Sequence, residues 1–134
     1  MQLELIPGGT RVEANGDGQA VDISGSQTRT FLCTLLVFDQ IEQESLDISI
    51  WGSPDGENWG AKPVLKLPQR FYRGETRAVL DLTMQPEVKY IRTKWEVNRW
   101  GRVAPLPRFV IGLTLVEVAA MPRRAPAEMV RGSP

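Results

Sequence analysis

Glycine and proline interrupt this chain so often that little room is left for helices. Its 134 residues include twelve glycines and ten prolines, and no window between them shows apolar residues at helical spacing. The segments between these residues either alternate apolar and polar side chains or are apolar throughout, which is typical of β-strands. The sequence therefore predicts an all-β protein.

Turn-forming residues separate seven segments that carry the strand pattern: 2–6, 19–24, 29–41, 46–52, 76–82, 88–97 and 108–118. The segment RTFLCTLLVFDQI is apolar in both phases, which predicts a central strand covered on both faces. The later strands alternate, so their inner faces can be predicted: Leu46, Ile48 and Ile50 in one strand, and Ile91, Thr93, Trp95 and Val97 in another.

A chain of this length forms one domain. We expect residues 1–118 to fold as a single antiparallel β-sandwich of jelly-roll type. Residues 119–134 (AAMPRRAPAEMVRGSP) are rich in proline, alanine and arginine and cannot continue a sheet. They are predicted to form a C-terminal extension that is flexible or bound by a partner.

The residue types that most enzymes need are missing. Histidine is absent, and Cys33 is the single cysteine, placed in an apolar run where a buried and unreactive thiol is expected. This removes the usual general base, the Ser/His/Asp and Cys/His nucleophile pairs, and the common zinc ligand sets. The acidic residues between 42 and 57 are predicted to lie on solvated rims. We therefore expect no enzymatic activity, cofactor or metal.

Charge and hydropathy restrict the partners. Net charge is zero and the basic residues are scattered, which argues against nucleic-acid binding. The start lacks the pattern of a signal peptide, and no apolar run has the roughly 20 residues of a membrane span, so a cytoplasmic location is expected. Residues 1–60 hold ten acidic and two basic residues, whereas 61–134 hold six and fourteen. Such a division suits head-to-tail contacts between copies, unless the strands of the two halves interleave.

The stretch GSPDGENWG (52–60) is predicted to be a turn. Ser53, Pro54 and Gly56 occupy the positions that a type I turn favours, directly after an alternating strand. Trp59 is expected to fold back over the preceding strand. The alternative, a calcium loop built on the oxygens around Asp55, lacks the ligand spacing of an EF-hand.

Three motifs in order, SPDGENW, YIRTKWEV and PRFVIGLTLVEV, resemble those of small β-sandwich proteins from phage and prophage virion gene sets. The resemblance covers residues 29–118 and implies a structural subunit or decoration protein of a virion-like or other repeating assembly. The first two motifs are also similar to discoidin or galactose-binding jelly rolls, which implies a carbohydrate-binding module as the alternative.

The loop NRWGRVAPLP (98–107) departs from the virion-protein pattern, where a short Gly/Ser turn is usual. Stiffening prolines lower the ordering cost of binding, and arginine with tryptophan is enriched in binding hot spots. We therefore predict that this loop and the tail bind a protein partner, or a glycan in the alternative. The predicted partner-binding residues are Arg99, Trp100, Arg102, Arg123, Arg124 and Arg131.

Overall fold

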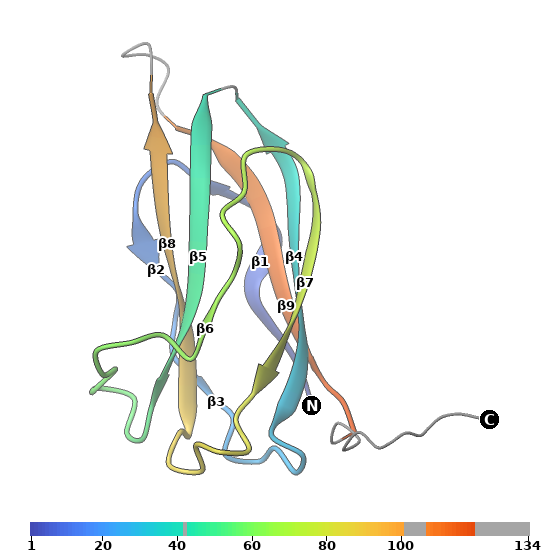
Figure 1. Cartoon of the computed structure of the whole chain (residues 1–134), viewed down its shortest axis with the longest axis vertical. Coiled ribbons are helices and arrows are strands. Elements are labelled where there is room, and N and C mark those ends of the chain that lie inside the picture. Colours follow the sequence, from blue (N-terminus) through green and yellow to red (C-terminus); the bar gives the residue numbers. More distant parts are fainter. Residues whose placement is uncertain (42, 101–106, 120–134) are drawn as a thin grey trace, which may run out of the picture.

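The computed structural model describes residues 1–41, 43–100 and 107–119, and these form an all-β protein of two antiparallel sheets (Figure 1). Within that part of the chain there is no helix, and so none that could cross a membrane. The strands are β1 (Gln2–Val12), β2 (Gly16–Asp17), β3 (Val21–Asp22), β4 (Thr30–Gln40), β5 (Glu44–Ser53), β6 (Leu65–Lys66), β7 (Gly74–Asp81), β8 (Tyr90–Arg99) and β9 (Phe109–Glu117).

Sheet A has the strand order β1-β9-β4-β7, and sheet B has the order β2-β8-β5-β6 with β3 also paired to β8. The chain passes repeatedly between the two layers. The first strand, β1, and the last strand, β9, are neighbours in sheet A. Each sheet combines strands from the acidic and the basic half of the sequence. The charges of the two halves are therefore interleaved and do not form separate acidic and basic layers.

The core lies between the sheets and consists of the inward phase of each long strand. Leu46, Ile48 and Ile50 are almost fully buried, as the alternation predicted. The same holds for Ile91, Thr93 and Val97 of β8, while Trp95 is partly buried against the core. Two sheets that face one another and bury the inward side chains of their long strands form a β-sandwich, and this part of the fold prediction is confirmed.

Strand β4 is central in sheet A, between β9 and β7, but it is not covered on both faces by the described residues. Its inward phase, which consists of Phe31, Cys33, Leu35 and Val37, is at most 4% exposed. Its outward phase contains Leu32 and Leu36, which are half-buried, and Phe38, which is 46% exposed. The prediction of two covered faces is therefore wrong for this part of the chain.

Two local features also differ from the expected strands. The first strand does not end at the GGT sequence: β1 continues to Val12 through an irregularity at which its register with β9 shifts between Ile6 and Thr10. Gly9 supports the irregularity with a φ of 89°, a backbone conformation that glycine adopts without strain. The two-residue strand β6 was not predicted, and it adds an edge to β5 through Lys66 and Leu65.

Candidate interaction surfaces

One end of the sandwich brings together segments that are distant in sequence. The turn between β4 and β5, the end of β8 and the connection from β6 to β7 reach this end, at the top of Figure 1. Arg70 of the connection exchanges two backbone hydrogen bonds with Leu46, of 2.8 and 2.9 Å. The N–H of Trp100 donates to the carbonyl of Gln43 at 3.0 Å. These main-chain bonds position the side chains that follow Arg70 and β8.

Phe71, Tyr72 and Trp100 form an exposed aromatic cluster at this end. The ring centroids of Phe71 and Tyr72 are 6.3 Å apart, and those of Phe71 and Trp100 are 6.2 Å apart in an edge-on arrangement, both within the range of favourable ring contacts. Phe71 is 39% exposed, Tyr72 69% and Trp100 49%. Aromatic residues are enriched in protein–protein interfaces, and tryptophan and tyrosine in their hot spots, so this cluster is a candidate interaction surface.

The structure places two of the predicted partner-binding residues here. Trp100 belongs to the aromatic cluster, and Arg99 is the last residue of β8, half-buried and in register with Glu44 of β5. The other predicted residues, Arg102, Arg123, Arg124 and Arg131, lie outside the described residues. Sequence reasoning missed the two aromatic residues on the β6–β7 connection. Their adjacency between two arginines, in the sequence RFYR, was the available signal.

A buried carboxylate supports this end from within. Glu44 is 1% exposed, so its predicted place on a solvated rim is wrong. Its two oxygens accept hydrogen bonds from the backbone N–H groups of Ile41 and Arg108, each 2.7 Å long. Burial raises the pKa of Glu44, although these bonds and the charges of Arg99 and Arg108 act in the opposite direction. The side chain thus ties the β4–β5 turn to the residue before β9.

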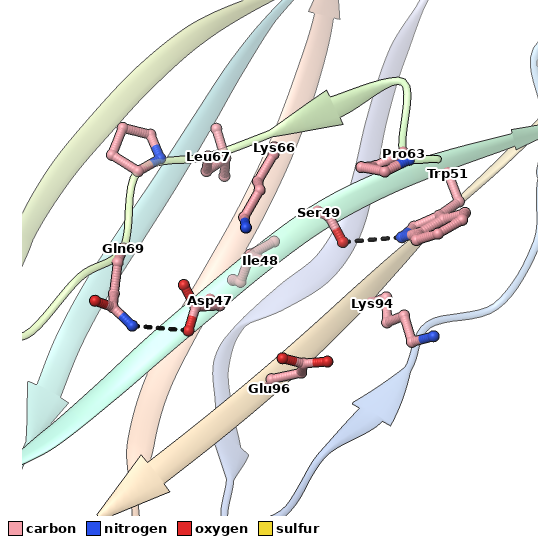
Figure 2. A pocket seen from close by; sticks show the side chains of 11 residues that line it. Asp47, Ile48, Ser49, Trp51, Pro63, Lys66, Leu67, Gln69, Lys94 and Glu96 are labelled. Carbon is pink, nitrogen blue, oxygen red and sulfur yellow. Dashed lines mark hydrogen bonds between the residues drawn. The ribbon is translucent and has the colours of Figure 1, made fainter. Parts of the chain in front are cut away.

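A second candidate site is a groove of about 860 Å³ on the outer face of sheet B (Figure 2). Its floor consists of β5 and β8, and residues 63–69 form one wall. The polar and aromatic side chains that line it are Asp47, Ser49, Trp51, Lys66, Gln69, Lys94 and Glu96.

Cross-strand register arranges the groove in rows. Ser49 lies between Lys94 of β8 and Lys66 of β6, while Asp47 lies opposite Glu96. Like charges opposite each other on neighbouring strands are unfavourable. Here the positive charges of Lys66 and Lys94 lie near the negative charges of Asp47 and Glu96 and offset their repulsion. The result is a surface that offers both hydrogen-bond donors and acceptors without net charge.

Hydrogen bonds orient the groove side chains (Figure 2). The indole N–H of Trp51 donates to the hydroxyl of Ser49 at 2.9 Å, and the amide of Gln69 donates to Asp47 at 2.9 Å. The ammonium group of Lys94 lies 5.3 Å from the centre of the Trp51 ring. An exposed cation–π contact of this kind contributes only about 0.5–1 kcal/mol, so a ligand can displace the lysine from the ring.

The SPDGENW segment is a turn built on two side chains. The hydroxyl of Ser53 accepts hydrogen bonds from the N–H groups of Asp55 and Gly56, and one carboxylate oxygen of Asp55 accepts from the N–H groups of Glu57 and Asn58. The hydrogen bonds that Asp55 accepts, chiefly that from the N–H of Asn58, hold the pKa of Asp55 well below its usual range. Its acceptor oxygens are thus engaged within the turn.

Trp59 lies near Arg92 of the neighbouring strand β8, whose guanidinium is 4.4 Å from the ring centre. Among the described residues there is no group of three or more histidine, cysteine, aspartate or glutamate side chains that could hold a metal ion.

The chain matches no protein family model, and no curated protein sequence is significantly similar to it. The proposals below therefore start from the chemistry of the aromatic cluster and the groove.

Proposed function

We propose that this protein is a non-catalytic interaction module that binds a protein partner through the end of the sandwich that carries Phe71, Tyr72 and Trp100. The observation that carries this proposal is the exposure of three aromatic rings at one end of the fold, where Phe71 contacts both Tyr72 and Trp100. Tryptophan, tyrosine and arginine are the residues most enriched in hot spots, and Arg70 and Arg73 flank two of these rings in sequence.

The proposed role is that of a subunit or decoration protein in a virion-like or other repeating assembly, in the cytoplasm or on the virion. The strand order supports a jelly roll as the specific type of sandwich. The first strand pairs with the last, and β1, β9, β4 and β7 form one sheet while the remaining strands form the second. This is the arrangement of two interleaved Greek keys. Jelly rolls occur in capsid proteins and lectins, so the fold supports the class by analogy. Arg102, Arg123, Arg124 and Arg131 are also proposed to contact the partner.

Affinity capture from the source cells or a phage lysate tests the proposal. The full chain is compared with a Tyr72→Ala/Trp100→Ala variant, with Trp59→Ala as a matched control outside the cluster. We expect a stoichiometric partner to be lost with the double variant and retained with the control, while the melting temperatures stay close. Equal recovery with the double variant, or the absence of a stoichiometric partner with the unchanged chain, would overturn it.

Carbohydrate binding is a second candidate function, and the groove on sheet B is the observation that favours it. A tryptophan ring can stack on the C–H face of a sugar, and Asp47, Gln69 and Lys66 supply acceptors and donors for hydroxyl groups. In this candidate function the sugar would stack on Trp51, whereas the sequence analysis predicted glycan contact in the loop that contains Trp100.

A glycan array followed by calorimetry separates the two candidates. If the groove binds sugar, Trp51→Ala abolishes the signal and Trp100→Ala leaves it unchanged. Loss of glycan binding in Trp100→Ala would instead assign the sugar to the aromatic end. An array without any bound glycan would remove this candidate and leave the protein-binding proposal intact.

A further inference from the structure

The outer face of sheet A is more apolar than a solvated sheet face. Antiparallel sheets that face water on one side carry mainly polar residues there. The outward side chains of this sheet include five large apolar ones: Leu32, Leu36, Phe38, Val79 and Val116. Phe38 is 46% exposed, Val79 43% and Val116 38%. Grouped exposed apolar residues on a soluble protein mark an interaction site.

Strand register gathers three of these residues in one row. Leu32 of β4 lies opposite Val79 of β7 on one side and Val116 of β9 on the other, and Gln2 of β1 completes the row. The apolar side chains are thus adjacent across three strands. Side chains that touch in this way can be removed from water together when a flat partner covers them.

The next row shows which partner fits. Thr34 and Thr114 occupy its centre, Arg77 stands on the β7 edge and Glu4 on the β1 edge. The row is therefore positive at one edge of the sheet, negative at the other and neutral in between. Arg77 is 65% exposed at its side chain and also contacts Glu75 of its own strand.

This charge order is complementary to itself. A two-fold axis that runs parallel to the strands, between β4 and β9, exchanges the β7 edge with the β1 edge when two sheets face one another. It therefore sets Arg77 of each copy against Glu4 of the other and brings Leu32 over Val116. Paired sheets stack about 10 Å apart with their strands within about 30° of each other, so residues near the axis stay in register. An isologous contact of this type closes as a dimer.

We propose that two copies of this chain pair face to face through the outer faces of their A sheets, with Arg77 of each copy against Glu4 of the other. This surface differs from the aromatic end, so the pairing can fail while the partner contact of the proposed function holds, and the reverse. Together, a two-fold contact on one face and a second contact at the end would allow a module to link neighbours in a repeating assembly.

Charge exchange tests the pairing. Sedimentation velocity from micromolar to millimolar concentration is applied to the full chain and to Arg77→Glu, Glu4→Arg and the double variant. Each single variant places like charges together twice, and we expect dimerisation to weaken by roughly tenfold or more. The double variant restores opposite charges and should dimerise as the unchanged chain does. Lys62→Glu makes the same charge change outside sheet A and should have no effect.

Mixing the two single variants gives the sharpest readout. The Arg77→Glu copy is acidic at both edges of the row, and the Glu4→Arg copy is basic at both. Both edge pairs therefore become attractive, and a mixed dimer should form from two weakly associating proteins. Circular dichroism melts confirm that all variants are folded. A monomeric unchanged chain at all concentrations, or a mixture that associates no better than its components, would overturn the proposal.

Discussion

Glu117, the last residue of β9, accepts hydrogen bonds from both the backbone N–H and the hydroxyl group of Thr28, at 2.7 and 3.0 Å. The same oxygen accepts from the hydroxyl of Ser26 and the N–H of Gln27, at 2.7 and 2.8 Å. These bonds, chiefly that from Thr28 N–H, lower the pKa of Glu117 to about 2. One carboxylate therefore holds the loop before β4 against the end of β9.

The pH dependence of stability follows from this lowered pKa. Because the folded-state pKa of about 2 lies below the reference value of 4.5, the contribution of Glu117 is fully present above pH 4.5 and is lost as the pH falls toward 2. We expect Glu117→Gln to lower the melting temperature by several degrees at pH 7, and the gap to the unchanged chain to narrow below pH 4.5. Thermal melts across this range measure it. Glu13→Gln, at an exposed site, should show no comparable gap, and a gap independent of pH would contradict the assignment.

Arg29 connects β4 to the loop before β8. Its guanidinium donates hydrogen bonds to the carbonyls of Gln85 and Val88, each at 2.8 Å, and to that of Leu82 at 3.3 Å. Lysine keeps the charge, but its donors all lie on one nitrogen and cannot reproduce the donors that Arg29 directs from both Nε and Nη2. We expect Arg29→Lys to reduce the free energy of unfolding by about 1–3 kcal/mol, measured in urea. Arg73→Lys, on an exposed side chain, is the matched control, and equal effects of the two substitutions would refute the bridging role.

The inner faces of the strands could be predicted because alternation reports burial directly. Leu46, Ile48 and Ile50 had only one side to occupy once a core lay on one face of the sheet. The outward phase of β4 was misjudged for the same reason. Apolar residues such as Leu36 indicate a face that is removed from water. The sequence does not show whether a second layer of the same chain or another molecule covers that face.

The β1 irregularity and the aromatic cluster depend on contacts that local patterns do not encode. Gly8 and Gly9 are as suitable for a turn as for a bulge, and only pairing with β9 decides between them. Phe71 and Trp100 meet because Arg70 pairs with β5 and β5 pairs with β8. That relation requires the complete strand order of sheet B.

Gly112 marks the closest approach of β9 and the irregular part of β1. A Cβ atom at this position would lie 2.8 Å from the Cα of Gly8 and 3.3 Å from its nitrogen, and backbone atoms cannot move aside as a flexible side chain can. We expect Gly112→Ala to cost about 1–3 kcal/mol of unfolding free energy through overpacking, measured by denaturant titration. Gly25→Ala serves as control, because its nearest neighbour is the end of the Met1 side chain at 3.5 Å. Similar stability of the two variants would contradict the tight contact.

Cys33 lies in the inward phase of β4 and is fully buried, and burial raises the pKa of its thiol to about 12. The thiolate is the reactive form, and a reagent can reach it only when sheet A opens. We therefore expect labelling by a disulfide reagent at pH 8 to be at least a thousandfold slower in the folded protein than in denaturant, on the order of the ratio set by the opening equilibrium. A Gln19→Cys/Cys33→Ala variant carries an exposed thiol instead and should react at the rate of the unfolded chain. Rapid labelling of Cys33 in the folded protein would mean that β4 opens readily, and it would contradict the stable central position in sheet A on which both the core and the face-to-face pairing depend.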